Sequence, residues 1–258
     1  MTWNAEQYLR FGGHRLRPVL DLIAAIDLAA PRRIIDLGCG PGNATMMLRE
    51  RWPGCELTGL DNDPAMLARA RADHPDGRWI DGDIAGWAGH ASGERYDLVF
   101  TNAALHWVPD HGTLFPALMN AVAPEGVFAC QMPRNFAAPS HALLRETMKD
   151  ARWRDRLAEH AEWEPVAEPA AYYDWLRPHA SALDIWETEY LQVLQGEDAV
   201  LEWVKGTALV PVRNALSAPE YAVFTAIYGA KLRAAYPRRA DGVTLLPFRR
   251  LFMVARAA

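Results

Sequence analysis

Short apolar runs alternate with amphipathic segments through the first half of the chain. In the amphipathic segments, apolar residues recur at helical spacing over 16–26, 42–52, 64–72 and 111–123. Buried strands that alternate with helices are typical of a parallel sheet covered on both faces. We therefore predict five parallel strands within residues 31–133, at "RRIIDL", "CELTGLD", "GRWIDGD", "YDLVFTNA" and "EGVFACQMP".

The pattern changes after Pro133. Residues 140–180 have helical propensity and no strand pattern, and five of the ten tryptophans fall between 153 and 203, which favours a helical cap over a pocket. Two final strands near 183–194 and 247–256 bracket helices around 197–206 and 219–235. We predict one α/β domain over 1–258. It has a Rossmann-like, doubly wound, mostly parallel seven-stranded sheet, a cofactor-binding core at 31–133 and a helical cap inserted at 140–180.

Composition and charge exclude several classes of partner. The formal net charge is −5 and the pI is near 5.9, which argues against a nucleic-acid partner because such proteins need a basic surface. No apolar stretch approaches the roughly 18 residues of a membrane span, and "MTWNAEQYLRF" lacks the apolar centre of a signal peptide. We expect a cytoplasmic protein with no membrane partner and no obligate protein partner. Cys39, Cys55 and Cys130 lack metal-ligand spacing and are expected to be buried free thiols.

A glycine-rich turn, "IIDLGCGPGNAT", follows the first predicted strand. Glycine adopts positive φ and lets a ligand approach the backbone, and ligands of open α/β sheets bind at this edge. The dinucleotide fingerprint G-x-G-x-x-G fits poorly, because Asn43 stands where its third glycine belongs. In addition, Pro41 has no N–H to donate to a phosphate. The turn therefore disfavours NAD as the cofactor.

The turn resembles the first motif of the class I S-adenosylmethionine-dependent methyltransferases. That motif has an acidic residue and then G-x-G-x-G, matched here by Asp36, Gly38, Gly40 and Gly42. The resemblance implies that S-adenosyl-L-methionine binds there, with S-adenosyl-L-homocysteine as the product. Asn43 follows the glycines and is included in the implied site.

Three later segments match further motifs of this family in order, each at the end of a predicted strand. Asp61 implies a carboxylate on the ribose hydroxyls, with Asn62 beside it. In "DGDI", Asp83 would accept from the adenine amino group and Ile84 would pack on the ring. "FTNAALHWVPD" resembles the motif beside the methyl group and adds Asn102 and Leu105 to the cofactor residues.

The resemblance to the trans-aconitate 2-methyltransferase family extends over nearly the whole length, through "MTWNAEQYLRFGGHRLRP", "LHWVPD", "QMPRNF", "AYYDWL" and "FRRLFMVAR". It implies a carboxyl O-methyltransferase that forms a monomethyl ester of trans-aconitate or a related polycarboxylate. A carboxylate is already an anionic nucleophile at pH 7, so no general base is required. The absence of a His, Cys and carboxylate ligand pattern in the sequence predicts that no metal is needed.

A trianion in an acidic protein needs local positive charge, for which the candidates are Arg15, Arg17, Arg134, Arg249 and Arg250. Strand alternation puts Arg249 and Arg250 on opposite faces. We prefer Arg250 because it shares a face with Phe252 and Val254. Arg17 could bind the acceptor or the methionine carboxylate of the cofactor. The remaining acceptor-site candidates are His106, Trp107, Asn135 and Tyr172. Tyr172 and Tyr173 could each donate a hydroxyl to a carboxylate, or could only pack within the cap.

Two alternatives stay open from the sequence. A small-molecule methyltransferase with an apolar phenol-like or quinone-like acceptor would have an apolar pocket without convergent arginines. A non-catalytic S-adenosylmethionine-binding protein would have an intact cofactor motif beside a pocket closed by side chains.

Overall fold

The computed structural model of the chain describes residues 12–90, 93–162 and 166–258. These residues fold into two compact units. The sheet unit comprises the described residues of 15–133, 166–188 and 250–258, and the helix-rich unit comprises those of 12–14, 134–162 and 189–249.

Seven strands form a sheet in the order β3-β2-β1-β4-β5-β7-β6. Neighbouring strands from β3 to β5 are parallel, and β7 is antiparallel to β5. The predicted α/β class with a mostly parallel, doubly wound, seven-stranded sheet is confirmed. The strands are β1 (Arg33–Leu37), β2 (Glu56–Asp61), β3 (Arg78–Asp81), β4 (Tyr96–Asn102), β5 (Val122–Pro133), β6 (Ala180–Gln195) and β7 (Val243–Ala257).

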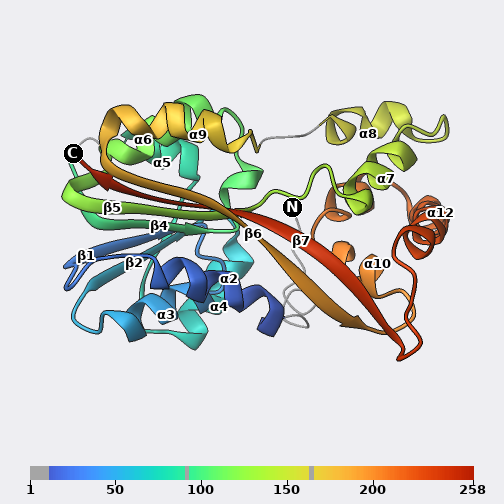
Figure 1. Ribbon diagram of the computed structural model, residues 1–258, viewed down its shortest axis with the longest axis horizontal. Coiled ribbons are helices and arrows are strands. Elements are labelled where there is room, and N and C mark those ends of the chain that lie inside the picture. Colours follow the sequence, from blue (N-terminus) through green and yellow to red (C-terminus); the bar gives the residue numbers. More distant parts are fainter. Residues whose placement is uncertain (1–11, 91–92, 163–165) are drawn as a thin grey trace. The chain divides into compact units, whose positions relative to one another are not determined.

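Helices cover both faces of this sheet within the sheet unit. Figure 1 shows α2, α3 and α4 on one face and α5, α6 and α9 on the other. The helices and 3-10 turns along this part of the chain are α2 (Gly12–Ala24), α3 (Asn43–Arg51), α4 (Pro64–Asp73), α5 (Ile84–His90), η1 (Leu105–Trp107), α6 (His111–Asn120), α9 (Pro169–Leu176) and η2 (Arg177–His179).

Strand alternation assigns side chains to the two faces. Leu37, Val99 and Phe128 belong to a buried core with Phe115 of α6 and Tyr172 of α9. Their neighbours in the strands therefore point to the opposite face, which α2, α3 and α4 cover. Because both faces are covered, consecutive apolar residues of a central strand are buried, as Ile34 and Ile35 of β1 are.

The predicted helix over 111–123 ends earlier than expected, at Asn120. Val122 instead begins β5 and pairs with Tyr96, whose N–H also donates to the carbonyl oxygen of Ala121. The apolar spacing of Ala121 and Val122 suits a helix, but pairing with β4 satisfies their backbone and ends the helix.

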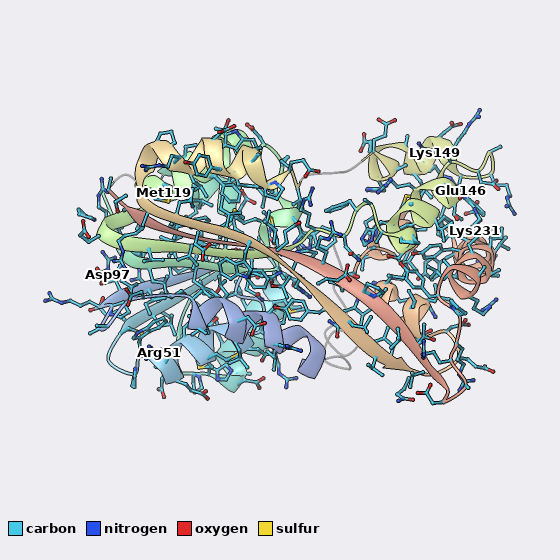
Figure 2. All side chains as sticks on the ribbon, viewed as in Figure 1. Arg51, Asp97, Met119, Glu146, Lys149 and Lys231 are labelled. Atoms are coloured by element: carbon cyan, nitrogen blue, oxygen red, sulfur yellow. The ribbon has the colours of Figure 1, made fainter. Side chains whose placement is uncertain are left out.

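The helix-rich unit has its own core, which includes Leu144, Trp153, Trp203 and Phe224. An ion pair between Glu146 and Lys231 (3.0 Å) joins α7 to α12, and both residues are labelled in Figure 2. The helices are α7 (Pro139–Met148), α8 (Arg154–Ala161), α10 (Ala199–Lys205), α11 (Val210–Ala215) and α12 (Ala218–Ala235).

The predicted insertion at 140–180 contributes to both units. Helices α7 and α8 belong to the helix-rich unit, whereas α9 and η2 belong to the sheet unit. The idea that these residues cap a pocket in a single domain stays a prediction.

Candidate active site

The glycine turn between β1 and α3 has the backbone geometry that its sequence predicts. Gly38, Gly40 and Gly42 have φ values of +73°, +55° and +88°, in the left-handed region that favours glycine. A Cβ atom at Gly38 would overlap the Cβ of Ala104, so the turn lies against the loop that follows β4. A Cβ atom at Gly40 would meet no described atom within 4 Å, so the described residues leave space beside the turn.

Asp36 lies beneath this turn and is 1% exposed. Its Oδ2 accepts a hydrogen bond of 2.6 Å from the hydroxyl of Thr45 in α3. Burial raises the pKa of Asp36 to about 7, and the negative charge of Asp61 adds to the rise, whereas the Thr45 hydrogen bond opposes it. Asp36 therefore supports the turn from inside the fold.

Asp61, at the end of β2, is tied to the glycine turn. Its Oδ2 accepts from the N–H of Gly40 (2.8 Å) and its Oδ1 from the N–H of Asp63 (2.9 Å). The half-buried carboxylate keeps lone pairs for a ligand, since each oxygen can accept more than one hydrogen bond. Burial raises its pKa. Asp63, rather than Asp61, caps α4, and Asn62 is exposed beside them.

The segment after β3 reaches the same turn. Ile84 is buried, and its Cδ1 would lie 3.6 Å from a Cβ atom at Gly38. Asp83 is exposed, and its Oδ2 accepts from the N–H of Gly86 (2.9 Å) in the first turn of α5. The helix-capping role and the predicted adenine contact are compatible, because the other oxygen of the carboxylate can still accept.

Asn102 is the last residue of β4, and the loop that follows carries Leu105, His106 and Trp107. The Oδ1 of Asn102 is buried and has no hydrogen-bond partner among the described residues. Leu105 is buried in the core. The rings of His106 and Trp107 are 4.8 Å apart, with His106 half-buried and Trp107 39% exposed. This loop therefore presents polar and aromatic groups at the carboxyl end of β4.

The structure favours a packing role for Tyr172 over a contact with substrate. Tyr172 is completely buried, and its hydroxyl lies 2.7 Å from Nδ1 of His111 and accepts from the N–H of Ala167 (3.1 Å). The other ring nitrogen of His111 lies 2.9 Å from the carbonyl oxygen of Leu105. Since a carbonyl only accepts, neutral His111 carries its proton on Nε2, and Tyr172 donates to Nδ1.

Arg250 is 5% exposed, whereas its neighbour Arg249 is exposed, so the predicted alternation is confirmed. Nη1 of Arg250 donates to Oε1 of Gln131 in β5 (3.2 Å). Gln131 is not among the residues predicted from the sequence. The sequence could have identified it, because Gln131 is a single polar amide among the apolar residues of the strand "VFACQMP".

The remaining predicted residues are Arg17, Asn43, Asn135 and Arg15. Arg17, in α2, and Asn43, the first residue of α3, are both exposed. Asn135 belongs to the helix-rich unit, where its Oδ1 accepts from the N–H of Arg249 (3.1 Å). The side chain of Arg15 and the segment "MTWNAEQYLRF" lie outside the described residues. The roles of these residues stay predictions.

Three further observations concern the described part of the chain. It contains no group of three or more His, Cys, Asp or Glu side chains placed to hold a metal ion. None of its helices is both long and apolar enough to cross a membrane. All three cysteines are buried and free, as predicted.

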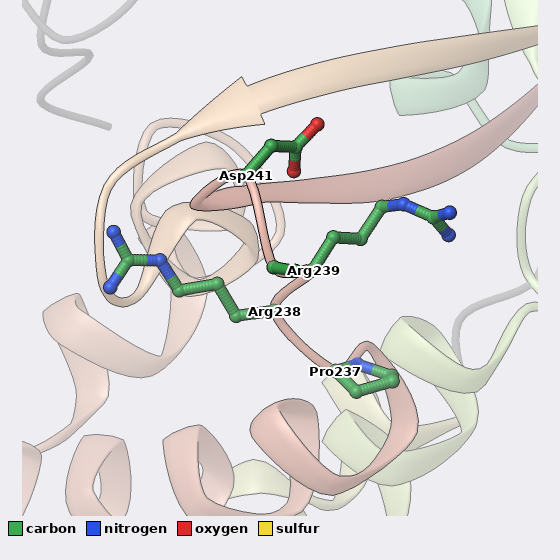
Figure 3. A pocket seen from close by; sticks show the side chains of 5 residues that line it. Pro237, Arg238, Arg239 and Asp241 are labelled. Atoms are coloured by element: carbon green, nitrogen blue, oxygen red, sulfur yellow. The ribbon is translucent and has the colours of Figure 1, made fainter.

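A hollow at the loop between α12 and β7 is lined by Pro237–Asp241. Arg238 and Arg239 point in different directions there (Figure 3), and Arg238 donates to the carbonyl oxygen of Gly242 (2.9 Å). The two arginines do not converge on one ligand position, so we do not count this hollow as a functional site.

Comparisons with known proteins agree with this geometry. A family described as a methyltransferase domain matches residues 34–126, which hold the glycine turn and the ends of β2, β3 and β4. A trans-aconitate 2-methyltransferase of Azoarcus sp. (strain BH72) is 46% identical over 254 residues, covering 98% of each chain. Another, of Streptomyces avermitilis, is 47% identical over 98% of this chain and 96% of its own.

Solved structures share the fold. The YcgJ protein of Bacillus subtilis has a TM-score of 0.60 at 12% identity, covering 95% of this chain and 98% of that protein. Phosphoethanolamine N-methyltransferase 2 of Haemonchus contortus, solved with S-adenosylhomocysteine, has a TM-score of 0.54 at 13% identity. The match covers 94% of this chain, which spans 53% of that protein.

Proposed function

Because the chain belongs to the trans-aconitate 2-methyltransferase family, we propose that it transfers a methyl group from S-adenosyl-L-methionine to one carboxylate of trans-aconitate or a related polycarboxylate. The products are a monomethyl ester and S-adenosyl-L-homocysteine. The proposed reaction uses a small-molecule acceptor and no metal, and we place it in the cytoplasm.

The observation that carries the proposal is the hydrogen bond from Gly40 to Asp61, which brings two cofactor motifs of this family together at one sheet edge. Because the described residues leave space beside Gly40, a ligand would have access to the backbone of the glycine turn. Asp61 would accept from the ribose, and Asp83 and Ile84 would hold the adenine. Gly38, Asn43, Asn102, Leu105 and Arg17 complete the proposed cofactor site.

S-adenosylmethionine, when bound, supplies a methyl group on a positively charged sulfur. The protein then has to align a carboxylate oxygen with that methyl carbon and keep water away. Alignment of reacting groups contributes about 7–11 kcal/mol in well-oriented intramolecular reactions. No residue needs to remove a proton, because the acceptor carboxylate is ionised at neutral pH.

A trianionic acceptor loses its hydration when it binds, so the protein has to supply hydrogen-bond donors in place of water. The protein has a net charge of −5, so these donors have to lie in the site itself. An arginine suits this task, because its planar fork can donate two parallel hydrogen bonds to a carboxylate. Arg250 is our first candidate, since it is buried on the sheet face that also carries Asp36 and Asn102. His106 and Trp107 would flank the reacting groups.

A methyl-transfer assay tests the proposal. Purified protein is incubated with methyl-labelled S-adenosylmethionine and a panel of di- and tricarboxylates, phenols and quinones. We expect label in a tricarboxylate product that mild base releases, because esters hydrolyse in base. Base-stable label in a phenol would contradict the proposed acceptor, and binding of S-adenosylmethionine without any transfer would contradict an enzymatic role.

A further inference from the structure

Gln131 is a buried polar residue in the middle of the sheet. It lies near the carboxyl end of β5, pairs with Asn102 of β4 and Phe252 of β7, and is 0% exposed. Its neighbours Cys130 and Met132 belong to the core shared with α6 and α9. Alternation therefore directs the Gln131 side chain to the opposite face, together with Asn102 and Arg250.

The chemistry of its partner fixes the orientation of the Gln131 amide. A guanidinium group has only donors, so the atom that faces Nη1 of Arg250 must be the amide oxygen. The amide nitrogen consequently points away from Arg250 with two N–H donors. Arg250 thus determines which end of Gln131 is offered to a ligand.

These two donors have no acceptor among the described residues. A buried N–H group without a partner is costly, and natural folds rarely keep one unless it has a role. The side-chain Oδ1 of Asn102, the residue of β4 that pairs with Gln131, is also buried and has no hydrogen-bond partner among the described residues. Both residues lie toward the carboxyl ends of their strands, where ligands of open α/β sheets bind.

We propose that the Nε2 amide of Gln131 donates a hydrogen bond to a ligand carboxylate, and that this carboxylate belongs to the acceptor. The inference rests on the proposed function and adds a specificity-determining residue to it. A ligand atom that meets the N–H donors of Gln131 must be an acceptor, and the positive charge of the buried Arg250 beside them favours an anionic acceptor such as a carboxylate oxygen. The same chemistry could be provided by the methionine carboxylate of the cofactor, and the experiment separates these two sources.

Two substitutions test the assignment. In Gln131→Glu, an oxygen still accepts from Arg250, so the strand packing is kept, but the donor is replaced by an oxygen that repels a carboxylate. Gln131→Met has nearly the same size and removes the donor without adding charge. The matched control is Thr101→Val, because the Thr101 hydroxyl is also buried and unpartnered among the described residues but points to the opposite face.

We measure the Michaelis constant for trans-aconitate, the dissociation constant of S-adenosylhomocysteine, and that of methylthioadenosine, which lacks the amino-acid carboxylate. We expect Gln131→Met to raise the Michaelis constant about tenfold and Gln131→Glu to raise it further, since a hydrogen bond to a charged group is lost. Both dissociation constants should stay unchanged, and Thr101→Val should change none of the three values.

The results that would contradict the assignment of Gln131 can be told apart. If S-adenosylhomocysteine binding weakens while methylthioadenosine binding does not, Gln131 binds the cofactor carboxylate and our assignment is wrong. An unchanged Michaelis constant in both variants, together with unchanged binding of S-adenosylhomocysteine, would show that the amide binds neither carboxylate. If the unmodified protein methylates no carboxylate in the panel, the proposed function fails and the acceptor assignment falls with it.

Discussion

Two aspartates of the glycine turn show how the surroundings set the chemistry of one residue type. Asp36 is enclosed beneath the turn, with Thr45 as its hydrogen-bond partner, and its pKa rises to about 7. Asp61 is only partly buried and accepts two backbone N–H groups, which oppose the rise that burial causes in its pKa. The first carboxylate supports the turn, and the second is available to a ligand.

Asp36→Asn should change how stability depends on pH. The pKa of Asp36 is about 7 in the folded protein and near 3.8 in the unfolded chain, so the folded state holds the proton more tightly. The contribution of Asp36 to stability is therefore complete below pH 3.8 and is lost as the pH rises to 7. The variant should gain stability relative to the unmodified protein between pH 4 and pH 7, as measured by urea unfolding. A stability difference that does not vary with pH would contradict this.

Asp61→Ala should weaken S-adenosylhomocysteine binding by about 1.5–3 kcal/mol, because a charged acceptor is removed. Isothermal titration calorimetry measures the change. The control is Asp63→Ala, two residues away, which removes the side-chain cap of α4 instead. Equal effects on affinity in the two variants would indicate that the substitution acts through the loop and not through a lost ligand contact.

At the scale of elements, most of the fold was predictable from the local pattern of apolar residues. The strands were predictable because fully buried strands are apolar runs, and Asp63 with Pro64 marked the start of α4. The pattern could not indicate which core α7, α8 and α9 join, because amphipathic helices match any apolar surface. The Gln131–Arg250 contact was not predictable either, since it joins residues 119 positions apart.

Tyr172→Phe tests whether α9 serves packing or substrate binding. The variant loses the hydroxyl between His111 and Ala167 and leaves a buried ring nitrogen without its donor. We expect urea unfolding to report about 1–3 kcal/mol of lost stability. The Michaelis constant for the acceptor should not change. The control, Tyr173→Phe, alters an exposed residue and should be neutral. A raised Michaelis constant with normal stability would instead place the Tyr172 hydroxyl on the substrate.

At the scale of the whole molecule, activity should survive removal of divalent metal ions. An ionised carboxylate attacks without a metal-activated base, so we expect the same rate before and after treatment with EDTA. Loss of activity that a divalent ion restores would refute this prediction.

The net charge of −5 also means that long-range attraction does not gather a polycarboxylate, so short-range donors have to select it. Selection of the acceptor therefore depends most on one buried cation, Arg250. Arg250 is held by the sheet on the face that carries Asn102 and Gln131, whereas Arg249 is exposed on the other side of the strand.

The most direct test is therefore a kinetic comparison of Arg250→Leu with Arg249→Leu. For Arg250→Leu we predict a Michaelis constant for trans-aconitate that is at least tenfold higher, about 1.4 kcal/mol, with nearly unchanged affinity for S-adenosylhomocysteine. Arg249→Leu should leave both values as they are. If instead Arg250→Leu abolishes cofactor binding while the acceptor still binds, or changes neither value, the account of acceptor selection is wrong.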